Sequence, residues 1–240
     1  MVEAALQLFA VRGVGEVQPG DVLADALAAA LLAPDGPGLH EGDVLVVTSK
    51  VVSKAEGRLV AVDDGDPAAK VALVERESVR VLRRRGELRV TETTHGFVCA
   101  NAGVDLSNVA AGTAVLLPVD PDRSARRLRA DLRRRLDVDV GVIVSDTFGR
   151  AWRRGVVDVA IGSAGVAGIV DLRGTPDATG RILESTEVCV VDELAAAADV
   201  VMGKASGVPA VVVRGAPTAW LREGSVGEEV VRPYDEDLFR

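Results

Sequence analysis

The apolar residues of the chain fall into short β-branched runs and longer stretches with helical spacing. Helical spacing predicts four helices, over residues 21–31, 67–85, 121–136 and 193–202. Asp21 and Asp192 are the expected N-caps of the first and the last of these helices. Strand-length runs lie at 6–11, 43–47, 87–100 (a pair), 114–118, 142–144, 156–161, 187–192 and 210–213. This pattern predicts an α+β protein with mixed sheets flanked by helices.

One strand-length run leads into a group of charged side chains. Val142–Val144 has the β-branched content of a buried strand and is followed by Ser145, Asp146 and Thr147, where we expect a loop to begin. Three arginines follow: Arg150, Arg153 and Arg154. Hard oxygen donors beside guanidinium groups suit a divalent cation that holds a phosphate. The competing interpretation is an Asp-Thr turn followed by a solvated basic loop.

Two more polar segments follow predicted strands. After 43–47, two lysines four residues apart are each preceded by a serine (Ser49-Lys50 and Ser53-Lys54), which suits phosphate oxygens. An ordinary helix start with Lys54 and Glu56 at the surface explains the same pattern. After 87–100, Asn101, Asp105 and Asn108 offer oxygen ligands without the spacing of an EF-hand.

A glycine turn, Arg12 to Gly15, follows the first strand but does not complete a dinucleotide-binding fingerprint. Gln18 stands where the third glycine would be, and Pro19-Gly20 breaks any helix there. The turn still allows backbone N–H groups to approach a ligand. A dinucleotide-dependent oxidoreductase is therefore disfavoured.

Composition narrows the class of protein. The 240 residues allow one large domain or two small lobes, and 48% of them are hydrophobic while only 3% are aromatic. A net charge of −8 argues against a nucleic-acid or acidic-membrane binder. No apolar stretch is long enough to span a bilayer and no signal peptide is evident, so we expect a cytoplasmic protein. The two cysteines, Cys99 and Cys189, are expected to be buried free thiols.

No Walker A motif, kinase set, nucleophile elbow or HExxH motif occurs in the chain. The chemistry-bearing residues that remain are carboxylates, hydroxyls, lysines and glycine loops. That set fits phosphoryl transfer, in which positioning and charge neutralisation do most of the catalysis.

Four separated segments in one order resemble the coenzyme F420-0:L-glutamate ligase (CofE) family and the N-terminal domain of the related actinobacterial FbiB proteins. They are TSKVVSKAEGR (48–58), NAGVDLSN (101–108), SDTFGRAWRRGVVDVAIG (145–162) and GVPAVVVRG (207–215). The resemblance covers nearly the whole chain, so we expect one ligase domain over 1–240, built of two interleaved lobes and forming a homodimer. The nitroreductase-like domain of the actinobacterial relatives is not expected after Arg240.

The resemblance implies a ligase that uses GTP and a divalent metal, Mg²⁺ or Mn²⁺, with K⁺ as a further ion. Such an enzyme activates the carboxylate of a deazaflavin precursor as an acyl phosphate, attaches L-glutamate to it, and then extends the tail through γ-linkages. By position, Asp105, Asp146 and Thr147 would bind the metals and form the catalytic centre. The residues that would contact GTP are Arg12, Gly13, Val14, Gly15, Ser49, Lys50, Lys54, Asn108, Gly203, Lys204, Ala205, Ser206, Gly207, Val208 and Pro209.

The three arginines of the 150–154 segment are added as ligands for the anionic substrate on chemical grounds alone. Two positions depart from the family pattern. Val14-Gly15 stands where relatives often have Leu-Pro, which loosens the turn. Lys204 stands where relatives often have Gln or Glu, and a cation cannot ligate a metal. Either other groups complete the second metal site, or Lys204 replaces part of the ion's charge, and we hypothesise the latter.

Two other functions remain open at this stage. A ligase of the same fold could act on another carboxylate or amine, and a non-catalytic nucleotide-binding module could use the same loops.

Overall fold

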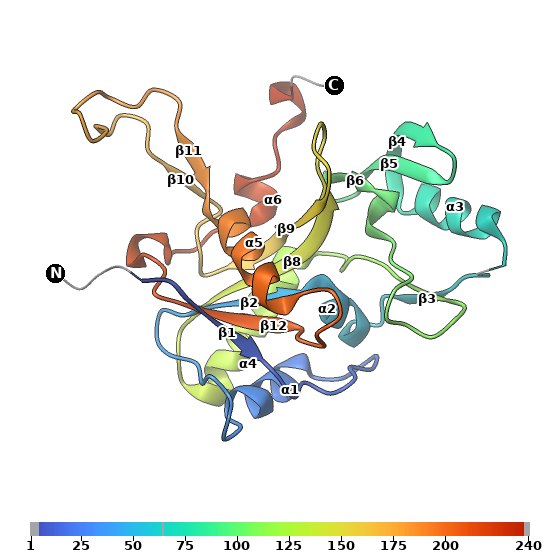
Figure 1. Cartoon of the computed structure of the whole chain (residues 1–240), viewed down its shortest axis with the longest axis horizontal. Coiled ribbons are helices and arrows are strands. Elements are labelled where there is room, and N and C mark those ends of the chain that lie inside the picture. Colours follow the sequence, from blue (N-terminus) through green and yellow to red (C-terminus); the bar gives the residue numbers. More distant parts are fainter. Residues whose placement is uncertain (1–4, 64, 238–240) are drawn as a thin grey trace.

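The computed structural model describes residues 5–63 and 65–237. Its centre is a five-stranded sheet in the order β1-β12-β2-β8-β9 (Figure 1). The strands are β1 (Gln7–Val11), β12 (Ala210–Arg214), β2 (Val44–Thr48), β8 (Gly141–Gly149) and β9 (Val156–Ala164).

The directions of these strands bring several chain segments to one edge of the sheet. β2 is parallel to β8, and β12 is antiparallel to both of its neighbours, β1 and β2. The carboxyl ends of β1 and β2 therefore lie beside the amino end of β12 at one edge of the sheet, and β8 continues past the end of β2 at this edge. Ligands of open sheets commonly bind outside the carboxyl ends of the strands.

Helices cover both faces of the central sheet. Leu45 and Val47 pack in one core with α1 (Leu23–Leu31) and α4 (Pro121–Leu136). Val44 and Val46 face the other way and pack with α5 (Val190–Met202). This alternation follows from the two-residue period of a strand that is buried on both faces. The predicted helix over 121–136 is confirmed at both ends, and its Arg126, Arg127, Arg133 and Arg134 are exposed.

A second lobe is inserted between α2 (Ser49–Ala55) and α4, and Figure 1 shows it beside the edge of the central sheet. It has a small core of its own that includes Leu73, Val74, Val104 and Leu116. Its elements are β3 (Leu59–Ala61), α3 (Pro67–Arg76), β4 (Ser78–Arg85), β5 (Leu88–Thr93), β6 (Val98–Ala100), η1 (Asn101–Gly103) and β7 (Thr113–Val115). The mixed α+β architecture with two interleaved lobes is thus present.

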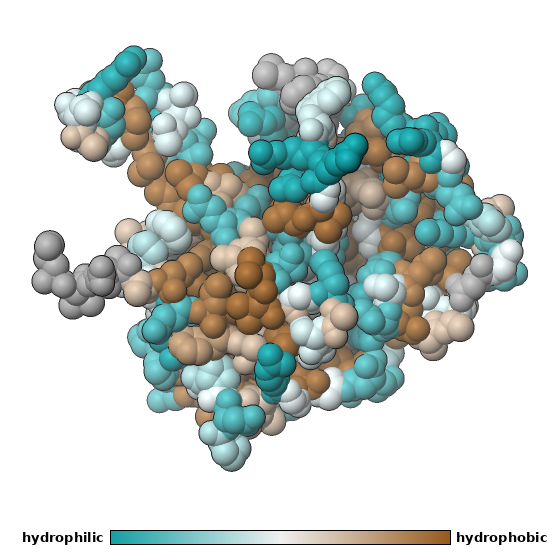
Figure 2. Space-filling view, viewed as in Figure 1, coloured by the Kyte–Doolittle hydropathy of each residue, from teal (hydrophilic) through white to brown (hydrophobic). Residues whose placement is uncertain are grey.

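The remaining elements lie outside these two lobes' cores. The ribbon of β10 (Ile169–Asp171) and β11 (Glu187–Cys189) projects from the body, and Figure 2 shows hydrophilic residues at its far end. The segment after β12 contains the short helices η2 (Thr218–Trp220), α6 (Val226–Glu229) and η3 (Tyr234–Glu236). Its last residues, 238–240, lie outside the described part. No described helix has the length and apolar character needed to cross a bilayer.

The prediction of one helix over 67–85 is wrong in its second half. The helix ends at Arg76, and Ser78–Arg85 forms strand β4, paired with β5. The three arginines at 83–85 would suit the carboxyl end of a helix, but they lie exposed near the β4–β5 turn.

Both predicted aspartate caps are also wrong. Val22 is the N-cap of α1, and the Asp21 carboxylate instead accepts a hydrogen bond from the Gln18 N–H. α5 begins at Val190, so Asp192 lies within its first turn, where its carboxylate accepts the Ala160 N–H of β9. In both cases the side chain satisfies a backbone donor outside its own helix.

Both cysteines are free, as expected, and burial raises the pKa of each thiol to about 12. Cys99 is 4% exposed, while Cys189 is only partly buried. Because thiolates are the reactive species, iodoacetamide at pH 8 should label both cysteines of the native protein at least about a hundredfold more slowly than in urea. Mass spectrometry of timed samples measures this; rapid native labelling of Cys99 would contradict its burial.

Candidate active site

A cavity of about 980 Å³ lies where the edge of the central sheet meets the second lobe. Four segments line it: the turn after β1, the β2–α2 junction, the loop after η1, and the loop between α5 and β12. The β8–β9 hairpin contributes side chains from a fifth direction. Three of these segments converge because the strands that precede or follow them end at one edge of the central sheet, and the second lobe supplies the loop after η1.

The strand β8 carries two of the predicted site residues in a way that the sequence did not suggest. Asp146 and Thr147 were expected in a loop, but β8 continues through them to Gly149 and pairs with β9, with Thr147 opposite Asp158. The register shifts between Val144 and Ser145, where the hairpin passes beyond the sheet edge. Because the strand alternates, Thr147 contacts Asp158 while Asp146 contacts Ser49 of α2.

Asp146 is half-buried and accepts a 2.8 Å hydrogen bond from Ser49 Oγ at its Oδ1 atom. Burial raises the pKa of this carboxyl to about 6, and repulsion from Asp158 and Asp105 adds to the effect. Repulsion between carboxylates in one cavity means that a bound cation would be favoured there.

Asp105 lies on the second lobe and, in contrast to Asp146, forms an ion pair with a lysine. Lys50 Nζ lies 2.7 Å from its Oδ2 atom and also donates to the Ser107 carbonyl, and the Ser107 N–H donates to Oδ1. Burial alone would raise the pKa of Asp105, but the hydrogen bonds from Lys50 and Ser107 outweigh it and lower the pKa. Asp105 is therefore an anion at neutral pH, and it joins the two lobes through Lys50.

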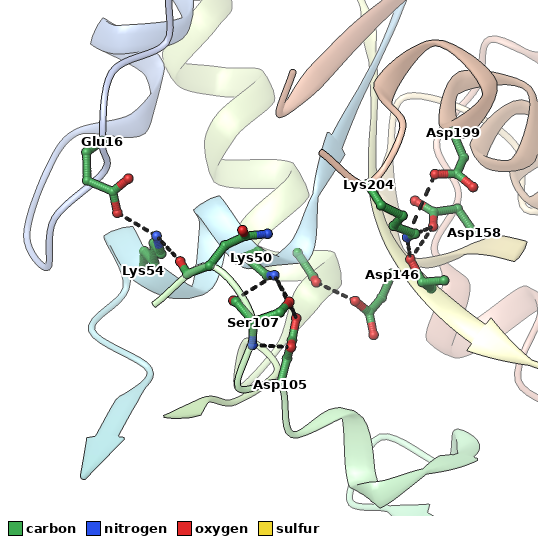
Figure 3. A network of polar contacts seen from close by, with 12 residues as sticks. Glu16, Lys50, Lys54, Asp105, Ser107, Asp146, Asp158, Asp199 and Lys204 are labelled. Atoms are coloured by element: carbon green, nitrogen blue, oxygen red, sulfur yellow. Dashed lines mark hydrogen bonds and ion pairs between the residues drawn. The ribbon is translucent and has the colours of Figure 1, made fainter. Parts of the chain in front are cut away.

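Lys54 is 7% exposed, so the competing interpretation of a surface lysine is wrong. Its ammonium lies 2.5 Å from Glu16 Oε1 and donates to the Asn108 carbonyl at 3.0 Å. Glu16 itself is exposed and follows the glycine turn. Lys54 therefore ties α2 to two loops of the cavity wall, and Figure 3 shows it on the far side of Lys50 from Lys204.

A second charged group lies on the other side of the cavity. Lys204 donates to Thr147 Oγ1, and its ammonium is 3.4 Å from Asp158 Oδ1 and 3.8 Å from Asp199 Oδ1 (Figure 3). Asp158 is 3% exposed and also accepts hydrogen bonds from Ser145 Oγ and Thr147 Oγ1.

Most of the residues that the sequence singled out line this one cavity. They are Val14, Gly15, Ser49, Lys50, Lys54, Asp105, Asn108, Asp146, Thr147, Gly203, Lys204, Ala205, Gly207, Val208 and Pro209. Arg12, Gly13 and Ser206 belong to the same loops but are not part of the lining. Arg150, Arg153 and Arg154 lie apart from it, exposed at the tip of the β8–β9 hairpin, where Figure 2 shows hydrophilic side chains gathered.

Sequence reasoning missed three acidic residues of the cavity: Glu16, Asp158 and Asp199. The pairing of β8 with β9 could have revealed Asp158, because a hairpin with a short turn places it opposite Thr147. Glu16 and Asp199 carry no comparable local signal, since their positions depend on how α5 and the glycine turn pack.

The side chains present fit one hard divalent cation between Asp105 and Asp146. Both offer carboxylate oxygens, which Mg²⁺ and Mn²⁺ prefer, and Asp146 accepts its 2.8 Å hydrogen bond from the neutral hydroxyl of Ser49. Among residues 5–63 and 65–237, no three His, Cys, Asp or Glu side chains are grouped as a complete metal site. Mg²⁺ commonly takes only one or two carboxylates and completes its shell with phosphate oxygens and water, so the two aspartates suffice when a phosphate is bound.

The fold and the site together define a class of protein. It is an α+β protein with a cavity lined by lysines and aspartates, side chains that suit a ligand bearing phosphate. The family model of F420-0:gamma-glutamyl ligase matches residues 13–215. The chain belongs to this family.

Named relatives agree with this assignment. The chain is 42% identical to the coenzyme F420:L-glutamate ligase of Methanothermobacter thermautotrophicus, over 98% of this chain and 99% of that protein. It is 44% identical to the ligase of the same name from Methanopyrus kandleri, over 94% of each chain. The Archaeoglobus fulgidus ligase is 43% identical, over 98% of this chain and 96% of that protein.

The raised pKa of Asp146 also predicts a pH dependence of stability. The folded state favours the protonated carboxyl, so the penalty for ionisation is small near pH 4 and grows as the pH rises to about 6. At pH 8 the free energy of unfolding of Asp146→Asn, measured by urea denaturation, should therefore exceed that of the wild type by roughly 1–3 kcal/mol. This gain should shrink at pH 4.5. A gain that is equal at both pH values would show that ionisation of Asp146 is not its cause.

Proposed function

We propose that this protein is a GTP-dependent γ-glutamyl ligase that adds L-glutamate to coenzyme F420-0 or its dehydro form. The observation that carries the proposal is the convergence of Lys50, Lys54, Asp105 and Asp146 on one cavity at the sheet edge. Family membership supplies the type of reaction, and the relatives' names supply the acceptor and the amino acid.

The chemistry requires a carboxylate to become an electrophile. A carboxylate oxygen of the acceptor attacks the γ-phosphorus of GTP, and the bond between that phosphorus and the β,γ-bridging oxygen breaks, which gives an acyl phosphate and GDP. The amine of glutamate then attacks the acyl carbon, phosphate leaves, and the amine loses a proton. Repetition on the γ-carboxylate of the newly added glutamate lengthens the tail.

Each wall of the cavity has a part in this scheme. Lys50 and Lys54 follow β2 on α2 and would pair with phosphate oxygens, since a compact ammonium suits that role. The glycine turn Arg12–Gly15 and the loop 203–209 would enclose the nucleotide through backbone groups. Asn108 would add an amide contact from the second lobe.

Asp105 and Asp146 would hold a divalent ion. When bound, such an ion neutralises the charge that develops on the transferred phosphoryl group. Ser49 orients Asp146 through its hydroxyl, and Lys50 orients Asp105, so that both carboxylates are fixed before the nucleotide arrives.

The direct test is incubation with GTP, Mg²⁺ or Mn²⁺, L-glutamate and coenzyme F420-0, followed by mass spectrometry. We expect GDP and coenzyme carrying additional glutamyl residues. If folded protein forms neither product, the proposal is wrong, and GDP formation with a different carboxylate or amine would reassign the substrate. The homodimer and the potassium ion stay predictions, to be checked by light scattering and by the K⁺ dependence of the same reaction.

Lys54→Met should weaken binding of a non-hydrolysable GTP analogue by about tenfold to a hundredfold, because one charge-assisted contact to phosphate is lost. Isothermal titration calorimetry measures the change. Lys70→Met is the matched control, since Lys70 lies on α3 and does not line the cavity. Equal affinities for the Lys54 variant and the wild type would remove Lys54 from the nucleotide site.

A further inference from the structure

Lys204 lines the cavity from the loop between α5 and β12. Its ammonium lies among the Thr147 hydroxyl and the carboxylates of Asp158 and Asp199, within 3.8 Å of the farther one. These groups come from both strands of the β8–β9 hairpin and from the last turns of α5. Hydroxyl and carboxylate oxygens grouped around one charge form the kind of surrounding that a hard metal cation receives.

We propose that the Lys204 ammonium is a built-in cation that fills a second cation position of the cavity, so that this protein binds its nucleotide with one divalent ion. The inference rests on the proposed function, because it assigns a role within the same nucleotide site. Lys204 supplies a fixed positive charge, and the carboxylates of Asp158 and Asp199 hold its ammonium in place.

The charge balance of the cavity supports this role. On one side, Asp105 is compensated by Lys50 at 2.7 Å, whereas Asp146 accepts its hydrogen bond from the neutral hydroxyl of Ser49. On the other side, Asp158 is 3% exposed, and a buried carboxylate is costly unless it is hydrogen-bonded and paired. Ser145 and Thr147 supply its hydrogen bonds and Lys204 supplies its counter-charge.

The loop that carries Lys204 explains how a surface residue reaches this place. The loop begins directly after Met202, and Gly203 has a φ of +56°, a backbone conformation that side-chain-bearing residues rarely adopt. Glycine thus allows the chain to turn sharply back over the cavity. The Lys204 side chain is 60% exposed, so its replacement leaves no void in the core.

Replacing Lys204 by glutamine should convert the position into a metal site. The substitution removes the ammonium and offers an amide oxygen beside Thr147, Asp158 and Asp199. Mn²⁺ bound per chain, in the presence of saturating non-hydrolysable GTP analogue, is measured by electron paramagnetic resonance. We expect about one ion for the wild type and about two for Lys204→Gln. Lys204→Arg, which keeps the charge, and Lys70→Gln, which removes a lysine elsewhere, should both stay at about one.

Two results would overturn the inference: two Mn²⁺ ions in the wild type, or one ion in a Lys204→Gln variant that is folded and binds the analogue. Circular dichroism and analogue affinity establish that the variant is folded and competent. The measurement involves no acceptor and no turnover, so its failure is separate from that of the ligase assay. A wild type that makes glutamylated product but binds two ions would refute this inference and keep the proposed function.

Discussion

Asp146→Asn should lower ligase turnover by at least about a hundredfold, although the same change stabilises the fold above pH 6. The neutral amide keeps an oxygen that can accept the Ser49 hydroxyl hydrogen, so the local structure should persist. It loses the negative charge with which Asp146 and Asp105 would hold the divalent ion. Loss of one of the two proposed metal ligands would remove charge neutralisation where the phosphoryl group is transferred.

Steady-state GDP release with glutamate and coenzyme F420-0 measures this effect. Asp171→Asn is the matched control, because Asp171 is an exposed aspartate of β10, paired with Arg173 and outside the cavity lining. The control should keep wild-type turnover. An Asp146→Asn variant with near-normal turnover would mean that the reaction does not use this carboxylate.

Gly162→Ala should destabilise the protein by about 2–3 kcal/mol or more, because no space exists for a methyl group. A Cβ at position 162 would lie 2.3 Å from the carbonyl carbon of Pro121 and 2.7 Å from the Asp122 nitrogen. Both are backbone atoms at the start of α4, so strand β9 and the helix would have to separate. The glycine is required by this close approach of strand and helix.

Thermal unfolding should place the variant about 4–10 °C below the wild type. Gly149→Ala provides the control, since nothing lies within 4 Å of a Cβ at that position. Equal melting temperatures for the two variants would contradict the close packing of β9 on α4.

The amphipathic elements of this fold could be predicted from the sequence, and the reasons for the failures are specific. α4 was predicted with both ends correct because proline, leucine spacing and a solvated arginine face agree over its whole length. The prediction failed for residues 67–85 because arginines are equally compatible with the end of a helix and with an exposed strand. Only pairing with β5, a contact made outside the segment, decides between them.

The candidate site, like the fold, could be predicted only in part from the sequence. Lys50, Lys54, Asp105 and Asp146 stood at the ends of predicted strands or beside them, so their chemistry was visible in the sequence. Their convergence depends on the order of strands in the central sheet and, for Asp105, on the placement of the second lobe, neither of which periodicity encodes. Asp199 was hidden for the same reason, because its role exists only through Lys204 on the loop that follows α5.

The most direct measurement is a crystal structure with a non-hydrolysable GTP analogue and Mn²⁺, with anomalous scattering data collected at the manganese edge. We expect the guanosine triphosphate in the cavity between the lobes and an anomalous peak shared by the Asp105 and Asp146 carboxylates. A nucleotide bound elsewhere, or manganese that touches neither aspartate, would contradict the proposed site.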